Sequence, residues 1–212
     1  MKITWTKTPR WVKLIFTNLV WDIPNNEQKV YLTFDDGPIP AVTEWVLDLL
    51  KSEGIKATFF CIGANIQKHS EIYQRILNEG HQTGNHTFHH LKGWKTTSKE
   101  YVQNVQSCEI EMKKWGPNNT KLFRPPFGKI TPNQVNALHN LGYKIIMWDV
   151  VSYDYNKAIS SEKCLNNVIT KSAQGSIIVF HDSLKAEKNL KYALPKALHF
   201  LKNNGCVFDV LT

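Results

Sequence analysis

Two adjacent aspartates stand where an apolar segment stops in the stretch YLTFDDGPIP. Asp35 and Asp36 follow Leu32 and Phe34, and a glycine and a proline come directly after them. Two carboxylates side by side repel each other, so their ionised forms need a cation or a protonatable group nearby. Asp, Gly and Pro are also common turn residues, so the pair could simply cap a turn. The other polar residues that the fold brings to the same place decide between these interpretations.

Two histidines four residues apart indicate metal chemistry. His86 and His90 occur in NHTFHH, and one helical turn would place both imidazoles on the same face. Two imidazoles and one carboxylate form a sensible zinc set that leaves a coordination position open for water. The spacing alone is a weak indicator, because any histidine-rich loop produces it, and His89 competes with His90 as a ligand. The segment is not the H-E-x-x-H motif of zinc proteases, because Thr87 stands at the glutamate position.

From residue 29 onward, strand and helix signals alternate along the chain. The apolar segments that predict strands are KVYLTF, ATFFCIG, HQTGN, KLF, YKIIMWDV, GSIIVFH and CVFDVL. Amphipathic segments between them predict helices, one opened by a capping box from Thr97 to Glu100 and one by Thr131 and Pro132. Strands that are apolar on both sides and separated by helices indicate a parallel sheet covered by helices. This α/β pattern suits a distorted (β/α) barrel of about seven parallel strands, with an open doubly wound sheet as the alternative.

In such folds the reactive face lies at the carboxyl ends of the strands. Polar residues follow five of the predicted strands: Asp35 and Asp36, then Asn85, His86 and His90, then Arg124, then Asp149 and Asp154, then His181 and Asp182. This concentration of acids, histidines and an arginine at one edge is not expected of a purely structural protein. The sequence therefore favours a catalytic or metal-binding site at this edge.

Composition limits the class of protein and its partners. The 212 residues, 42% hydrophobic and 21% charged, are typical of one globular domain. The 26 Lys and Arg against 18 Asp and Glu give a net charge of +8, which favours anionic partners or surfaces. The basic residues are spread along the chain without a dense run, so we expect no nucleic-acid partner.

We expect residues 1–28 to form an N-terminal helical extension packed on a domain of residues 29–212. Apolar residues of the extension recur at helical spacing: Trp11, Val12, Ile15, Phe16 and Leu19. Polar residues interrupt this run too often for a membrane span, but the helix could lie on a membrane surface. The segment also lacks a clear signal-peptide cleavage site, which favours a cytoplasmic or membrane-peripheral location over secretion.

Four motifs carry a family resemblance. TFDDGP, HTFHH, RPPFG and VFHD, in this order, resemble the signature motifs of the polysaccharide deacetylase family, also called the NodB-homology domain or carbohydrate esterase family 4. The resemblance covers roughly residues 29–211, nearly the whole chain. It implies a distorted (β/α) barrel that hydrolyses N-acetyl groups of amino sugars with a divalent metal. The metal is usually zinc, and cobalt or another divalent ion also fits.

The resemblance also implies roles for individual residues. Asp35 matches the catalytic base and Asp36 the metal-binding carboxylate, which would divide two tasks between the adjacent acids. His86 and His90 match the two histidine ligands of the metal. Arg124 matches the arginine that orients the base.

Further positions match the part of the family's site that binds substrate and donates a proton. Pro126 and Phe127 fall in the motif in which a backbone N–H helps to hold the oxyanion. Val179 lies where the family has an apolar residue near the acetyl methyl group, and His181 matches the general acid. Aromatic residues near these strand ends that could stack on sugar rings, or simply pack in the core, are Phe127, Trp94, Trp148 and Tyr155.

One motif departs from the family pattern D-x-x-D-W. This chain has Val151 at the first acid and Tyr155 at the tryptophan. The first acid normally supports the catalytic histidine or the arginine, so another acid would have to replace it. Asp154 matches the second acid of the motif, and Asp149 lies at the same predicted strand end. The sequence leaves both candidates open.

Together these inferences predict a hydrolase of carbon–nitrogen amide bonds, of the polysaccharide deacetylase type. Its predicted partner is an N-acetylated amino-sugar polymer or oligosaccharide, with N-acetylglucosamine units of peptidoglycan or a chitin-like oligomer as substrate. One alternative is a deformylase or amidase that acts on a small or lipid-linked amino sugar through the same site. Another, suggested by Val151, is a sugar-binding protein that keeps the metal without turnover. Release of acetate from an N-acetylated oligosaccharide separates the first function from both alternatives.

Overall fold

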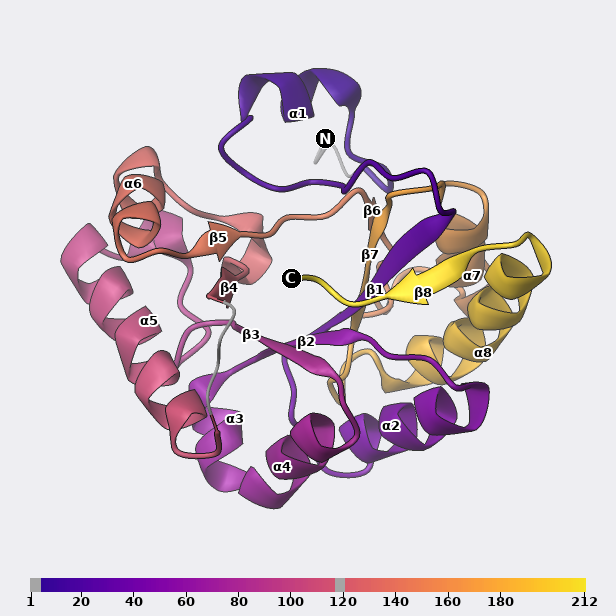
Figure 1. The fold of residues 1–212 in the computed structure, drawn as a ribbon, viewed down its shortest axis with the longest axis horizontal. Coiled ribbons are helices and arrows are strands. Elements are labelled where there is room, and N and C mark those ends of the chain that lie inside the picture. Colours follow the sequence, from indigo (N-terminus) through magenta and orange to yellow (C-terminus); the bar gives the residue numbers. More distant parts are fainter. Residues whose placement is uncertain (1–4, 117–120) are drawn as a thin grey trace.

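The computed structural model describes residues 5–116 and 121–212. Parallel strands form one curled sheet in the order β5-β4-β3-β2-β1-β7-β6, and β8 pairs with the first half of β1 (Figure 1). The strands are β1 (Lys29–Asp35), β2 (Thr58–Cys61), β3 (Gln82–Asn85), β4 (Leu122–Phe123), β5 (Lys144–Ile145), β6 (Val150–Val151), β7 (Ile177–His181) and β8 (Val207–Asp209). In the described part of the chain β5 and β6 do not pair with each other, so the barrel is incomplete. The predicted distorted (β/α) barrel is confirmed.

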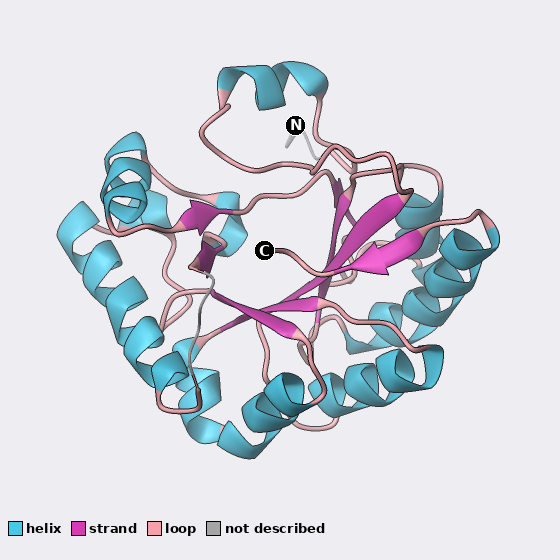
Figure 2. Cartoon of the chain, viewed as in Figure 1, coloured by secondary structure: helices cyan, strands magenta, loops and turns pink. Residues whose placement is uncertain are grey.

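Helices surround the sheet (Figure 2). They are α2 (Val42–Glu53), α3 (Gly63–Lys68), α4 (Ser70–Asn78), α5 (Ser98–Lys113), α6 (Pro132–Asn140), α7 (Ser161–Ile169) and α8 (Glu187–Asn203), with the short 3₁₀ helices η1 (Gly93–Lys95) and η2 (Pro126–Gly128). Both predicted helix starts are confirmed. Thr97 and Glu100 form a capping box at α5, and Thr131 caps α6 together with Gln134. These side chains satisfy backbone N–H groups that the first helical turn leaves free.

The N-terminal segment lies across the gap between β5 and β6. Val20 forms a bridge with Ile146, just after β5, and Lys7 forms a bridge with Val150 in β6. Between these two points the chain forms the short helix α1 (Arg10–Ile15), at the top of Figure 1. The segment thus supplies backbone hydrogen-bond partners to both edges that the incomplete barrel leaves open. Residues 1–4 of the predicted extension lie outside the described residues.

This N-terminal bridge explains why the predicted strand YKIIMWDV is two strands in the structure. β5 ends at Ile145 and β6 begins at Val150. Between them, the N–H of Met147 donates to the carbonyl of Val20, and the carbonyl of Asp149 accepts from the N–H of Thr8. The chain therefore crosses the open side of the barrel within these residues and pairs there with the N-terminal segment.

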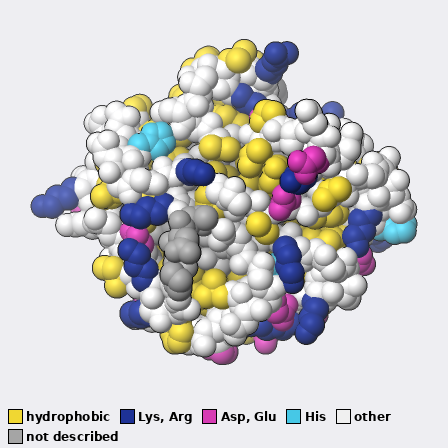
Figure 3. All heavy atoms as spheres, in the orientation of Figure 1, with side chains coloured by type: hydrophobic (Ala, Val, Ile, Leu, Met, Phe, Trp, Pro, Cys, Tyr) yellow, Lys and Arg dark blue, Asp and Glu magenta, His cyan; other side chains and the backbone are white. Residues whose placement is uncertain are grey.

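α1 exposes most of its apolar residues. Val12 is buried, but several apolar side chains of the segment are 41% to 66% exposed: Trp5, Trp11, Leu14, Ile15 and Phe16. Hydrophobic side chains are visible over α1 at the top of Figure 3. Within residues 5–116 and 121–212, no helix has both the length and the apolarity needed to cross a membrane.

The carboxyl terminus closes the barrel end at which the strands begin, near the centre of Figure 1. Leu211 is fully buried and belongs to an apolar cluster with Tyr31, Phe60 and Ile177. Its N–H donates to the hydroxyl of Thr58, the first residue of β2. The polar residues at the carboxyl ends of the strands lie at the other end of the barrel.

Candidate active site

Asp35 ends β1 and forms a buried ion pair with Arg124, which follows β4. Nη1 of Arg124 lies 2.6 Å from Oδ1 of Asp35, and neither side chain is more than 5% exposed. Such a pair interacts more strongly in the protein interior than in water. Oδ2 of Asp35 makes no hydrogen bond to the described part of the chain, and Asp35 lines a cavity. One carboxylate oxygen is therefore anchored while the other is available to accept a proton.

The guanidinium of Arg124 has several further hydrogen bonds. Nη1 also donates to the hydroxyl of Thr33, at 2.8 Å. Nη2 donates to the carbonyl of Met147 at 3.0 Å, and Nε to that of Ile146 at 3.4 Å. A planar guanidinium with directed donors is suited to such a fixed network. The hydroxyl and the main-chain oxygens hold Arg124 without the acid that Val151 replaces.

Asp36, His86 and His90 converge on one point, where their candidate ligand atoms lie within 4.8 Å of one another. Oδ1 of Asp36 is 3.2 Å from Nε2 of His90 and 3.7 Å from Nε2 of His86. The prediction that one helical turn aligns the two histidines is wrong. They lie on an irregular loop after β3, in which Thr87 and His90 have φ angles of 64° and 55°. These left-handed conformations bend the chain. As a result, the ring centroids of the two imidazoles are 5.1 Å apart.

Two asparagine side chains hold this loop. Asn85, the last residue of β3, accepts a hydrogen bond from the N–H of Thr87. Asn104 on α5 accepts hydrogen bonds from the N–H groups of Phe88 and His89. His89, the competing ligand candidate, is exposed, and its ring lies against that of Phe88 at 4.7 Å. The described metal-ligand cluster does not include His89.

The protonation states of His86 and Asp36 fit a divalent cation. Burial lowers the pKa of His86 to about 4, so its imidazole is neutral at pH 7. Its Nδ1 lies 2.8 Å from the carbonyl of Arg124, so Nδ1–H donates there and Nε2 presents its lone pair. Burial would raise the pKa of Asp36, but the hydrogen bond with His90 and the nearby imidazoles hold it well below its usual value. Two imidazoles and one carboxylate are a donor set that zinc and similar ions prefer.

His181 ends β7 and is held by Asp154 through two hydrogen bonds. Its Nδ1 lies 2.8 Å from Oδ1 of Asp154, and its backbone N–H donates to Oδ2 at 2.7 Å. Burial lowers the pKa of His181, but the adjacent carboxylate outweighs burial and the pKa rises to about 9. His181 is therefore protonated at pH 7. The pairing of β1 with β7 places it directly opposite Asp35.

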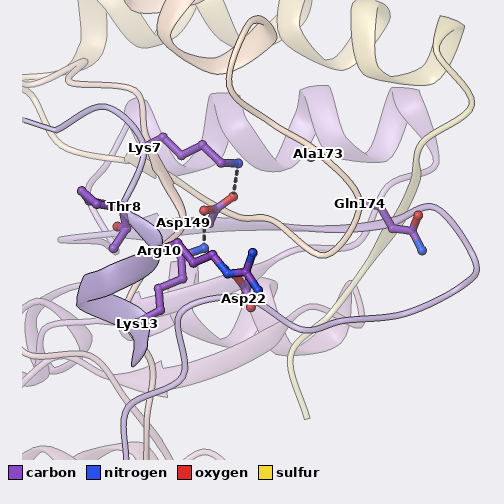
Figure 4. A pocket seen from close by; sticks show the side chains of 9 residues that line it. Lys7, Thr8, Arg10, Lys13, Asp22, Asp149, Ala173 and Gln174 are labelled. Carbon is purple, nitrogen blue, oxygen red and sulfur yellow. Dashed lines mark hydrogen bonds and ion pairs between the residues drawn. The ribbon is translucent and has the colours of Figure 1, made fainter. Parts of the chain in front are cut away.

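Asp149, the other acid that the sequence left open, lies apart from this site. Its carboxylate accepts hydrogen bonds from Lys7 at 2.7 Å, from Lys13 at 2.5 Å and from the hydroxyl of Ser176 at 2.5 Å. Asp149, Lys7 and Lys13 line a different cavity, of about 520 Å³, next to the N-terminal segment (Figure 4). The structure thus joins Asp154 to His181 and separates Asp149 from it.

Asp182, the last residue of the VFHD motif, is a buried residue that supports the site. Its Oδ1 accepts from the N–H of Gly37 at 3.0 Å, and its Oδ2 accepts from the hydroxyl of Thr43 at 2.6 Å. Its own N–H donates to the carbonyl of Asp35. A Cβ added at Gly37 would lie 2.0 Å from Oδ2, so no larger residue fits there. Asp182 therefore fixes the turn that follows β1. Its sequence signals are its place at a strand end and in the VFHD motif, neither of which indicates this contact.

A cavity of about 390 Å³ contains the polar groups Asp35, Asp36, His86, His90 and His181 in its lining. Its apolar and aromatic lining consists of Phe127, Trp148, Val151, Tyr155 and Val179. Among the described residues, Pro126 and Trp94 do not line it; Pro126 is buried at the start of η2, and the indole of Trp94 is exposed. Cavities of this size typically bind small molecules or one unit of a larger ligand.

Comparisons with known proteins agree with this geometry. The family model described as polysaccharide deacetylase matches residues 22–146. A peptidoglycan-N-acetylglucosamine deacetylase of Bacillus cereus is 36% identical over 189 residues, 89% of this chain and 68% of that protein. A chitooligosaccharide deacetylase of Azorhizobium caulinodans is 32% identical, with 76% of each chain covered. The crystal structure of a peptidoglycan N-acetylglucosamine deacetylase in complex with 4-naphthalen-1-yl-N-oxidanyl-benzamide has a TM-score of 0.88 and 34% identity, covering 96% of this chain and 95% of that one.

The curled barrel, the motifs at its strand ends and these matches define a hydrolase of carbon–nitrogen amide bonds. The chain belongs to the polysaccharide deacetylase family, the NodB-homology or carbohydrate esterase family 4 group. The family, the fold and the class of enzyme inferred from the sequence are confirmed.

Proposed function

We propose that this protein is a metal-dependent deacetylase that removes N-acetyl groups from N-acetylglucosamine-type units of peptidoglycan or a chitin-like oligosaccharide. The observation that carries the proposal is one cavity that contains the Asp36–His86–His90 cluster, the anchored carboxylate of Asp35 and a protonated His181. Amide hydrolysis needs an activated water, a proton acceptor and a proton donor for the leaving amine. The substrates named for the two similar deacetylases support a glycan as the substrate.

Asp36, His86 and His90 would hold the cation, with zinc as the first choice and cobalt or another divalent ion as alternatives. Bound there, the cation would lower the pKa of a water molecule and polarise the acetyl carbonyl. The neutral state of His86 and the ionised state of Asp36 mean that no proton has to leave these two ligands at pH 7.

Asp35 and His181 move the protons in this mechanism. Asp35 accepts a proton from the attacking water through its free Oδ2, while Arg124 fixes its other oxygen. General-base catalysis of this kind is typically worth about 10²–10⁴-fold in rate. His181, kept protonated by Asp154, donates a proton to the amine nitrogen as the carbon–nitrogen bond breaks. The products are acetate and a free amino sugar, and the glycosidic bond stays intact.

The cavity walls position the acetyl group. Phe127 has a φ of 60° in the turn that Pro126 begins, and its backbone N–H would donate to the oxyanion. One donor of this kind is typically worth about 2.7–4 kcal/mol in the transition state. Val179 on β7 lines the cavity, beside Val151 on β6 and Thr33 on β1, and would contact the acetyl methyl.

The test is product release from defined substrates. Metal-loaded protein is incubated with N-acetylated chitooligomers, peptidoglycan fragments and N-formylated amino sugars, and acetate and formate are quantified. We expect acetate from at least one oligomer, and loss of this activity after chelation with recovery on adding the metal. Formate without acetate would support the deformylase alternative. Saturable sugar binding without either product would support the binding-protein alternative.

We also propose that the N-terminal segment contacts an anionic membrane surface. The ring centroids of Trp5 and Trp11 are 5.5 Å apart. Leu14 and Ile15 of α1 also expose apolar side chains, and Arg10 beside them is exposed. Tryptophan favours the membrane–water interface, and basic residues favour anionic lipids.

We expect co-sedimentation with vesicles that contain anionic lipid, and clearly weaker binding for a Trp11→Ser, Leu14→Ser variant. An Ile110→Ser variant, changed at an exposed apolar residue on α5, is the matched control. Self-association without vesicle binding would instead identify a second copy as the partner.

A further inference from the structure

Two lysines stand over aromatic rings on opposite flanks of the active-site cavity. Lys185, which lines the cavity, has its Nζ 5.6 Å from the centroid of the Tyr155 ring. On the other flank, Nζ of Lys92 is 5.9 Å from the centroid of the Phe127 ring. Tyr155 follows β6 and Phe127 follows β4, and these strands lie on opposite sides of the central strand β1. We call Lys92 and Lys185 the rim lysines.

Each of these aromatic rings also contacts a histidine of the site. The ring centroids of Phe127 and His90 are 4.6 Å apart, and those of Tyr155 and His181 are 4.7 Å apart. A ligand group that binds a rim lysine is thus separated from the reacting atoms by about one aromatic side chain. This spacing suits a substituent on a neighbouring part of the substrate, rather than the acetyl group itself.

The rim lysines have no carboxylate partner within the described residues. The acids of the site are already engaged, Asp35 by Arg124 and Asp154 by His181. A ring face attracts an ammonium group but leaves its N–H donors available. By contrast, Lys7 and Lys13 on the N-terminal segment are paired with Asp149. The positive charge at the rim is therefore available to a ligand.

We propose that the rim lysines select glycans that carry an oxyanion, a carboxylate or a phosphate, next to the unit that is deacetylated. This inference rests on the proposed function and specifies the substrate class. The aromatic walls accept the face of any sugar ring, so they bind neutral and acidic glycans alike. The ammonium groups add a charge-assisted hydrogen bond only for an oxyanion. Lys185 has the larger role because it lines the cavity itself.

The test compares matched substrates on matched variants. The substrates are a neutral N-acetylglucosamine oligomer, an oligomer of the same length with lactyl carboxylates on alternate units, and the neutral oligomer with a terminal phosphate. The variants are Lys185→Gln, Lys185→Arg and Lys92→Gln, with Lys51→Gln on the exposed part of α2 as the control. For each combination, kcat and KM for acetate release are measured at low and high salt.

We expect Lys185→Gln to lower kcat/KM for an acidic oligomer about tenfold, chiefly through KM, and for the neutral oligomer less than about twofold. Lys185→Arg should retain most of the preference, Lys92→Gln should lose about threefold, and high salt should reduce the preference of the wild type. The lactyl and phosphate arms identify which oxyanion is selected. Equal losses on neutral and acidic oligomers, or no loss on the acidic ones, would overturn the proposal.

A binding measurement separates this inference from the proposed function. The affinities of the three oligomers for the Asp35→Asn protein, with and without Lys185→Gln, report charge selection without turnover. A preference for acidic oligomers that disappears with Lys185→Gln supports selection even where no acetate is released. Equal affinities for neutral and acidic oligomers overturn selection even where the wild type deacetylates both.

Discussion

Asp149 and Asp154 are two buried acids only a few residues apart, but they have different partners. They are 2% and 1% exposed. Asp149 accepts hydrogen bonds from Lys7 and Lys13, both on the N-terminal segment, so the interaction links that segment to the barrel. Asp154 accepts from His181, whose pKa it raises to about 9. The partner, rather than the acid, therefore decides whether a buried carboxylate ties segments together or controls a proton.

A similar contrast separates the groups around Asp149 from those around Asp36. Near Asp149 the carboxylate is surrounded by donors, two lysines and the hydroxyl of Ser176, so little capacity is left for a ligand. At the carboxyl ends of β1 and β3, Asp36 instead faces two imidazoles that can present lone pairs. We expect substitutions in the catalytic region to abolish metal binding or turnover, and those around Asp149 to affect the free energy of unfolding.

The largest expected effect comes from removing a metal ligand. His86→Ala removes one of two imidazoles, and the remaining groups, His90 and Asp36, are too few for tight binding. We expect the variant to be purified without metal and to release no detectable acetate. Elemental analysis and the acetate assay check this, with His139→Ala on α6 as the matched histidine control. Equal metal contents in His86→Ala and wild type would refute the ligand assignment.

The next effect separates proton transfer from metal binding. Asp35→Asn keeps the size of the side chain and its contact with Arg124, but an amide cannot accept the water proton. We expect kcat to fall by about 10²–10⁴-fold while the metal content stays at the wild-type level. A variant that keeps more than about a tenth of the wild-type rate would contradict the general-base role.

Much of this catalytic region could be predicted from residue types and their place at strand ends. Buried apolar strands end at or just before Asp35, Asp36, Arg124 and His181. Parallel strands bring their carboxyl ends to one edge of the sheet. The geometry of the histidine loop could not be predicted in this way. It depends on left-handed φ angles at two non-glycine residues, which long-range hydrogen bonds to side chains such as Asn104 stabilise.

The region around Asp149 was harder to predict, because distant segments define it. YKIIMWDV has the composition of one strand, yet the chain pairs with Val20 and Thr8 midway and splits into two. A boundary elsewhere in the fold was also hard to predict. ATFFCIG is predicted to be a strand to its end, whereas β2 stops at Cys61 and Gly63 begins α3. Gly63 lies close to Phe88 and the backbone of Cys108, so tertiary contacts fix this boundary. Single-segment patterns carry no information about such contacts.

Asp154 and Asp149 should affect the pH dependence of kcat differently. In wild type, kcat should decline at alkaline pH with a midpoint near pH 9. The reason is that His181 must be protonated to donate, and its pKa is about 9. Asp154→Asn removes the carboxylate that raises this pKa, and burial then lowers it, so the midpoint should move to lower pH. At pH 7 we expect a loss of about tenfold or more in kcat. Asp149→Asn should leave the midpoint in place, and a common shift in both variants would remove the distinction between the acids.

The smallest expected effect is on stability. Asp149→Asn leaves Lys7 and Lys13 without their shared carboxylate, although Lys13 keeps Asp22 as a partner. The loss of one member of a buried ion pair typically costs about 3–5 kcal/mol. Since the lysine side chains here are 40% and 18% exposed, water compensates part of this, and we expect about 1–3 kcal/mol. The measurement is urea unfolding at pH 7, with Asp48→Asn, which breaks the exposed pair with Arg75, as a control that should cost less than about 1 kcal/mol.

The pH dependence of this stability difference gives a second check on the role of Asp149. Burial alone would raise the pKa of Asp149, but the hydrogen bonds from Lys13 and Lys7 outweigh burial and lower it below the usual value. A carboxyl group with a lowered pKa in the folded state stabilises the fold above its unfolded pKa of about 3.9, and this contribution is lost as the pH falls through the folded value. The difference in free energy of unfolding between wild type and Asp149→Asn should therefore be constant from about pH 5 to 8 and shrink below about pH 4. A variant as stable as wild type at pH 7 would mean that the lysine cluster does not hold the N-terminal segment, because both lysines that contact Asp149 belong to that segment.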